Sequence, residues 1–267
     1  MENPYASPKG ALVQKAQPAP WTQHPSLQTD LQSLGAWLRR SGLRLLALNA
    51  IVQLPATLLL DVGDHLFQGL PTIVGSVVST LSTLITTAAV IRVALDDESG
   101  RSLSLGEALN FGVRNMGKLA MPVIGRQFAV LLASLLLVVP GLLLAARWMG
   151  LEAVILLNLP HPDETQQAVG TTPMKTTAAY SQDQLGTRIA TLLLLLLPML
   201  VMATLEGGWA YFAISSELSL PLLLGLSLPL AVLRGTAASL IPLTGTARVL
   251  STVHAKGMNT EPYWAVD

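Results

Sequence analysis

The fold is decided by residues 66–91, LFQGLPTIVGSVVSTLSTLITTAAVI. These 26 residues contain no charged side chain, and Arg92 follows them directly. A helix that crosses a bilayer needs about 20 predominantly apolar residues, so this stretch predicts a transmembrane helix. The seven serine and threonine residues between positions 76 and 87 are typical of a membrane helix that packs closely against other helices.

The composition of the whole chain supports the same class. Of 267 residues, 51% are hydrophobic and 12% are charged, about half of the ~25% charged residues in ordinary soluble domains. The mean hydropathy is +0.53. Sixteen basic and sixteen acidic residues give a net charge of zero, which offers no electrostatic argument for binding nucleic acid. The absence of cysteine excludes disulfides, thiolate nucleophiles and Cys-ligated metal sites.

Five further apolar segments extend this pattern in both directions. Pro140-Gly141 is a turn signal that divides the long block 119–158 into a hairpin of two spans. An alternative gives five spans, with this block forming one crossing and a re-entrant piece. The sequence thus predicts an all-α, polytopic transmembrane helix bundle of about six spans, at 41–60, 66–91, 119–139, 142–158, 189–205 and 226–247.

The polar segments between the spans predict one or two amphipathic helices. In residues 103–118, apolar and polar side chains alternate with helical spacing, and Ser102 or Ser104 is a candidate N-cap. We expect this helix to lie on the membrane surface. A similar polar segment begins near residue 165 and leads into the fifth span.

The two ends of the chain are polar. Residues 1–32 predict a disordered tail, 33–250 the transmembrane domain, and 251–267 a C-terminal tail. Trp21 and His24 are candidate anchors for a protein partner or a membrane surface, although a solvated tail is the simpler interpretation.

The basic residues predict the orientation. Thirteen of the sixteen fall on one side of the six-span arrangement, and the other three, Arg126, Arg147 and Arg234, fall inside spans. By the positive-inside rule, both termini of this multi-pass chain are expected in the cytoplasm. The five-span alternative would put the basic residues after position 170 outside.

The sequence resembles the six-helix membrane domain named after glycerophosphoryl diester phosphodiesterases, and related bacterial inner-membrane proteins. The resemblance covers roughly residues 100–255 and is carried by LSLGEALNFGVRN (103–115) and VVPGLLLAARWMGLEAVILL (138–157). The chain departs from the family at 171–188, where a Trp-bearing polar helix is usual, and at 246–257, where Tyr and Arg are usual. The resemblance implies that the membrane is the bacterial cytoplasmic (inner) membrane, and that the chain is a membrane domain without the hydrolase domain.

No catalytic or metal-binding pattern accompanies these segments. The four histidines lie far apart, and neither a zinc-protease motif nor a phosphate-binding loop is present. The sequence therefore predicts a protein that is not an enzyme and needs no cofactor.

Charged residues inside the spans are the remaining candidate site. An arginine at membrane depth costs ~2.5–3.5 kcal/mol on insertion scales, so Arg126, Arg147 and Arg234 need partners. Glu152 is the only acid in the predicted spans and could pair with Arg126 or Arg147. The alternatives are that the arginines extend to lipid headgroups, or that these four residues form a site for an anionic lipid.

Two functional hypotheses follow from the sequence. The first is a non-enzymatic integral inner-membrane protein, acting as a scaffold, as an accessory subunit of a membrane complex, or as an envelope factor. The second is a small transporter or anionic-lipid-binding permease, which the proline-interrupted spans and the buried arginines favour. The expected partners are the lipid bilayer, with anionic lipid as a candidate, and a protein bound through the N-terminal tail or the membrane faces.

Overall fold

The computed structural model describes residues 26–67, 71–98, 103–159, 172–215 and 220–255, and all regular structure in these ranges is helical. Six helical segments there are long and apolar enough to cross a membrane. The predicted all-α bundle of about six spans is thereby confirmed. The elements are α1 (Leu27–Phe67), α2 (Pro71–Glu98), α3 (Leu105–Leu136), α4 (Val138–Arg147), α5 (Leu151–Leu156), α7 (Pro173–Ser181), the 3₁₀ turn η2 (Gln182–Gln184), α8 (Leu185–Ser215) and α9 (Leu220–Ala255).

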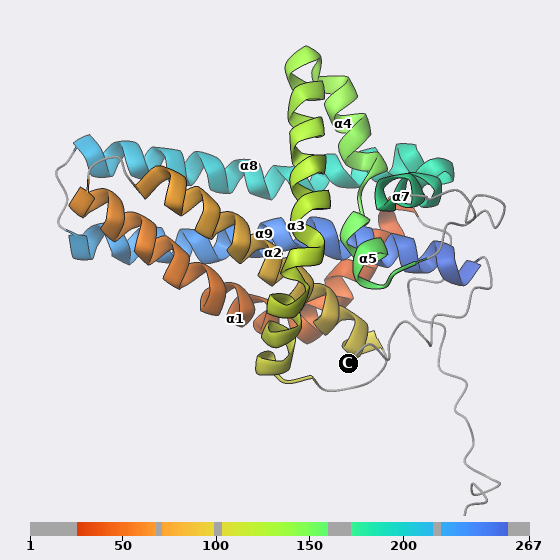
Figure 1. Ribbon diagram of the computed structural model, residues 1–267, viewed down its shortest axis with the longest axis horizontal. Helices are drawn as coiled ribbons and strands as arrows, with labels where there is room; N and C mark the ends of the chain where they lie inside the picture. The colour runs from red at the N-terminus through yellow and green to blue at the C-terminus, as the bar shows by residue number, and fades with distance from the viewer. Residues whose placement is uncertain (1–25, 68–70, 99–102, 160–171, 216–219, 256–267) are drawn as a thin grey trace, which may run out of the picture.

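Four long helices form the body of the molecule (Figure 1). Helices α1 and α2 form one antiparallel pair, α8 and α9 form a second, and α1 packs against α9 between the pairs. Helices α3 and α4 stand across these four, and the short helices α5 and α7 lie beside the base of α4. The polar side chains of the four long helices are therefore brought together from distant parts of the sequence.

The two ends of the helical domain extend beyond the predicted boundaries. Helix α1 begins at Leu27, so the end of the predicted tail 1–32 is helical rather than disordered. The reason is apolar packing, since Leu34 and Trp37 on its first turns are buried. Helix α9 continues to Ala255 because Val253, which lies in the predicted C-terminal tail, is also buried.

The predicted amphipathic helix and the third span are one continuous helix, α3. Ser104 is its N-cap, and Ser104 and Glu107 form a capping box: the Glu107 backbone N–H donates to Ser104 Oγ at 3.3 Å, and the Ser104 backbone N–H donates to Glu107 Oε2 at 2.9 Å. This confirms Ser104 as a cap. Nothing breaks the helix between the two segments, because Pro122 is accommodated inside it.

The hairpin turn lies three residues before the predicted Pro140-Gly141. Helix α3 ends at Leu136, Leu137 has extended backbone angles, and α4 begins at Val138. Pro140 sits in the first turn of α4, where a helix needs no backbone N–H from it. Gly141 is required for packing rather than for turning, since an added Cβ would collide with Ser134 on α3.

Helices α8 and α9 are longer than the spans predicted at 189–205 and 226–247. Helix α8 continues through Glu206 to Ser215, and α9 begins at Leu220. The charge of Glu206 does not end the helix, because Arg234 of α9 neutralises it.

Candidate functional site

A polar cavity lies inside the bundle, between α1, α2, α8 and α9. Its volume is about 130 Å³, room for about four water molecules at the ~30 Å³ that each occupies in the liquid. Its walls carry amide, hydroxyl and guanidinium groups but no carboxylate. The lining residues are Asn49, Gln53, Ser79, Thr83, Thr86, Thr87, Met199, Arg234, Gly235, Ala238 and Ser239.

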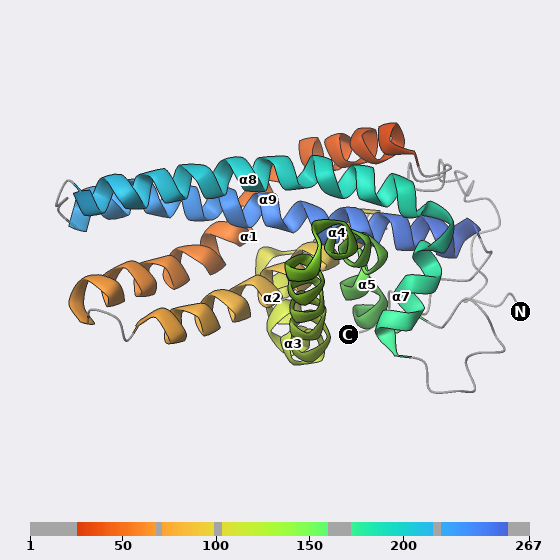
Figure 2. The same cartoon turned by 90° about the horizontal axis from the view of Figure 1, so that it is seen from above.

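The cavity has a buried floor and an open mouth. Asn49, Thr86 and Ser239 are buried, whereas Thr83 is exposed and Arg234 is partly exposed. From floor to mouth, α1 runs toward its C-terminus, α2 toward its N-terminus and α9 toward its N-terminus. Figure 2 shows the α1–α2 and α8–α9 pairs diverging in that direction. The mouth therefore faces the end of the bundle where α1 and α8 end.

Asn49 forms the floor. Its Nδ2 donates to the Leu45 carbonyl at 3.0 Å and to Ser239 Oγ at 3.4 Å. Its Oδ1 is buried and accepts no hydrogen bond from the described part of the chain. Gly235 makes this position available, because an added Cβ there would stand 2.6 Å from Asn49 Oδ1. Because Asn49 is 0% exposed, its Oδ1 packs against Gly235, and Asn49 closes the cavity at this end.

The hydroxyl groups add further acceptors. Thr83 donates to the Ser79 carbonyl at 2.9 Å, and Ser239 donates to the Gly235 carbonyl at 2.8 Å. The single proton of each hydroxyl is thus used within its own helix, while the oxygen retains capacity to accept. The wall is consequently rich in uncharged oxygen acceptors.

An ion pair between α8 and α9 stands at the mouth. Arg234 Nη1 lies 2.9 Å from Glu206 Oε2, and the two side chains are 43% and 25% exposed. Because the guanidinium is neutralised by an acid from the neighbouring helix, Arg234 does not depend on an external anion for its partner.

The other predicted site residues lie elsewhere. Glu152 Oε1 pairs with Arg126 Nη2 at 2.7 Å, with side chains 4% and 19% exposed. This pair joins α3 to α5, whereas Arg147 is exposed at the end of α4. The structure therefore does not bring the four charged residues into one site, and Arg234 belongs to the cavity. Trp21 and His24 lie outside the described residues.

Two further arginines, which border the predicted spans 189–205 and 226–247, are buried in the structure. Arg188 and Arg248 are 0% and 1% exposed. Arg188 donates to the carbonyls of Met149 at 2.8 Å and Tyr180 at 3.1 Å, and Arg248 donates to Thr191 Oγ1 at 2.9 Å. These bonds tie α7, α8 and α9 to the corner that follows α4.

Sequence analysis also missed the cavity itself. The sequence does contain one indication of it: Asn49 and Gln53 are uncharged polar residues in an apolar segment. Because they are four positions apart, they lie on the same face of the helix. Thr86 and Thr87 had been assigned to helix packing alone. Their role in the cavity depends on α9, which lies about 150 residues further along the chain.

The fold and the cavity define an integral, multi-pass membrane protein with a polar interior. Comparison of the chain with known protein families, with curated proteins and with solved structures finds no match. The resemblance to the glycerophosphoryl diester phosphodiesterase membrane domain stays a prediction.

Proposed function

We propose that this chain is a small, non-enzymatic permease that binds an uncharged polar solute in the cavity between α1, α2, α8 and α9. The observation that carries the proposal is the set of polar side chains, with Gln53, Thr83 and Ser239 among them, that line a cavity of about 130 Å³ between apolar helices. A purely structural membrane bundle would gain stability by filling such a space with apolar side chains.

The walls favour a solute that donates hydrogen bonds. The acceptors include the hydroxyl oxygens of Thr83 and Ser239, and no carboxylate in the lining balances a cation in the cavity. An anion is not favoured either, because Glu206 already neutralises Arg234. Small polyols and amides, which carry several O–H or N–H donors, fit this chemistry and this volume.

We further propose that the chain resides in a bacterial inner membrane with both termini in the cytoplasm. The support is the distribution of basic residues together with the family resemblance. In this orientation the mouth of the cavity faces away from the cytoplasm.

Solute flux into liposomes tests the proposal. Purified protein is reconstituted, and glycerol and urea permeability is measured by stopped-flow light scattering. Asn49→Leu removes the hydrogen bond to Ser239 and puts an apolar side chain at the floor of the cavity, so we expect it to abolish the protein-dependent flux. Asn110→Leu, the same change at an exposed position of α3, is the matched control. No flux above empty liposomes for either solute, or equal flux in Asn49→Leu, would contradict the proposal.

The alternatives derived from the sequence have their own test. A scaffold or accessory subunit would retain a protein partner on purification in mild detergent. A permease for anionic lipid would retain that lipid through Arg234, and native mass spectrometry of Arg234→Gln would then show its loss. The Arg234–Glu206 pair argues against the lipid alternative, and we expect identical lipid profiles.

A further inference from the structure

The α3–α4 hairpin is set across the four long helices rather than along them. In Figure 1, α1, α2, α8 and α9 follow the length of the molecule and α3 stands across them. Figure 2, turned by 90°, shows α3 nearly end-on, so the two views agree. When the four long helices cross the bilayer, the axis of α3 lies close to the membrane plane.

The hairpin contacts the bundle at the end where the uncharged segments of α2 and α9 are followed by basic residues. Arg92 and Arg248 end these segments, and we call this the basic end. The guanidinium carbon of Arg92 lies 5.3 Å from the ring centre of Phe111 on α3. At the other arm, Arg188 donates to the carbonyl of Met149, just after α4. Both arms of the hairpin therefore leave the bundle at the basic end.

The uncharged arms would be too short to cross a bilayer even if the hairpin were turned to lie along the membrane normal. Beyond Arg126, which is fixed to Glu152, α3 has only ten residues before its end at Leu136. Helix α4 has nine residues, from Val138, before Arg147. At 1.5 Å per residue each arm reaches about 15 Å, half of the ~30 Å hydrocarbon core.

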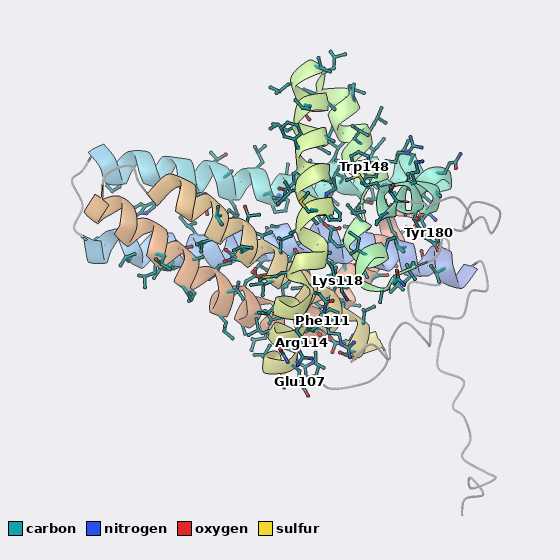
Figure 3. The ribbon with its side chains drawn as sticks, viewed as in Figure 1. Glu107, Phe111, Arg114, Lys118, Trp148 and Tyr180 are labelled. Atoms are coloured by element: carbon teal, nitrogen blue, oxygen red, sulfur yellow. The ribbon has the colours of Figure 1, made fainter. Side chains whose placement is uncertain are left out.

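The surface of the hairpin changes at the same point. Figure 3 shows Glu107, Arg114 and Lys118 on the part of α3 nearest its N-terminus, where they are exposed. Beyond Arg126 the exposed side chains are almost entirely apolar, and Leu136 is 82% exposed. The apolar members of this distal surface, which we call the hairpin tip, are Phe128, Leu131, Leu132, Leu135, Leu136, Leu137, Val138, Val139 and Leu143.

We infer that the hairpin tip lies within one leaflet of the bilayer, the leaflet at the basic end, and that its surface is covered by lipid acyl chains. Water is excluded as the main neighbour, because a contiguous exposed apolar surface of this kind is unfavourable in water. Arg114 and Lys118 stand where they can reach the headgroups. Two of the six sufficiently apolar helices would then not be full crossings.

Single cysteines test this placement without background, because the chain contains none. The variants are Leu137→Cys at the turn, Asn110→Cys on the exposed part of α3, and Gly208→Cys near the opposite end of the bundle. A membrane-impermeant maleimide is applied to spheroplasts and to inverted vesicles. We expect Asn110→Cys to label from the basic side, Gly208→Cys from the opposite side, and Leu137→Cys from neither, although a lipid-soluble maleimide should reach it.

Labelling of Leu137→Cys from the side that labels Gly208→Cys would overturn the inference, because the hairpin would then cross the bilayer. Labelling from the basic side at the rate of Asn110→Cys would also overturn it, since the tip would stand in water. The same assay in liposomes that contain only this chain, at a low protein-to-lipid ratio, distinguishes lipid from protein. If protection in cells is lost there, a protein partner rather than lipid covers the tip.

Discussion

Two regions of the molecule differ in where their polar side chains lie: the bundle of α1, α2, α8 and α9, and the α3–α4 hairpin. The bundle encloses a polar cavity, with Asn49 at its floor and the Arg234–Glu206 pair at its mouth. The hairpin carries its charges at the base, where Arg126 meets Glu152, and exposes an apolar tip. Under the proposed function the bundle binds a solute, and under the inferred placement the hairpin tip contacts lipid.

Neutralising the acid in each of two ion pairs, Arg126–Glu152 and Arg234–Glu206, should give the largest difference between the two regions. Glu152 is 4% exposed and Glu206 is 25% exposed. Glu152→Gln leaves Arg126 without its partner in a buried setting, which costs ~3–5 kcal/mol. We expect a large fall in the melting temperature in mild detergent. Glu206→Gln, the matched change at the more exposed pair, should cost about 1 kcal/mol or less.

A second variant checks the reason for that loss. If the cost of Glu152→Gln comes from a stranded cation, adding Arg126→Met should recover part of the stability. Equal losses for Glu152→Gln and Glu206→Gln, or no recovery in the double variant, would show that the base of the hairpin is not held by this pair.

The joint between the two regions should be sensitive to a single methyl group. In Gly245→Ala, the new Cβ would stand 2.8 Å from the Cα of Gly150, which itself has a left-handed φ of 96°. Overpacking of this kind costs about 1–3 kcal/mol. We expect a lower melting temperature by differential scanning fluorimetry. Gly225→Ala is the control on the same helix, because nothing lies within 4 Å of its added Cβ, and it should leave stability unchanged or slightly higher.

The smallest expected effect concerns the first turn of α3. The Ser104 side-chain hydrogen bond, with the Ser104 backbone bond next, lowers the pKa of Glu107 from its ordinary 4.5. Because the folded pKa is depressed, this stabilisation is present above the unfolded pKa and is lost as the pH falls through the folded value. When the pH falls below the folded pKa of Glu107, amide hydrogen exchange at this turn should be faster than in the Glu107→Gln variant at the same pH. The glutamine side chain does not ionise, so the variant lacks this pH-dependent loss. Identical pH profiles would contradict this.

Local sequence patterns predicted the helices well, and the capping motif at Ser104 as well. What they could not predict depended on contacts between different helices. The charge of Glu206 predicted the end of a span, because its partner Arg234 lies 28 residues later in the chain. Pro140-Gly141 looked like a turn because its packing role against Ser134 is not visible locally.

The candidate site was less accessible from sequence than the fold. Charged residues in apolar segments drew attention to Arg126, Arg147, Glu152 and Arg234, of which the structure places only Arg234 at the cavity. The floor is made by Asn49, whose uncharged amide carries little signal until the neighbouring helices are in place.

One measurement tests the contrast between a polar interior and a lipid-covered hairpin most directly. Nitroxide labels are placed on Thr83→Cys, at the mouth of the cavity, and on Leu135→Cys, in the hairpin tip, in protein reconstituted in liposomes. Collision with a water-soluble nickel chelate and with oxygen is measured by power-saturation electron paramagnetic resonance. We predict that the nickel chelate reaches the label at Thr83, whereas oxygen dominates at Leu135. The same oxygen-dominated profile at both positions would show that lipid rather than a polar solute occupies the cavity, and would contradict the proposed function.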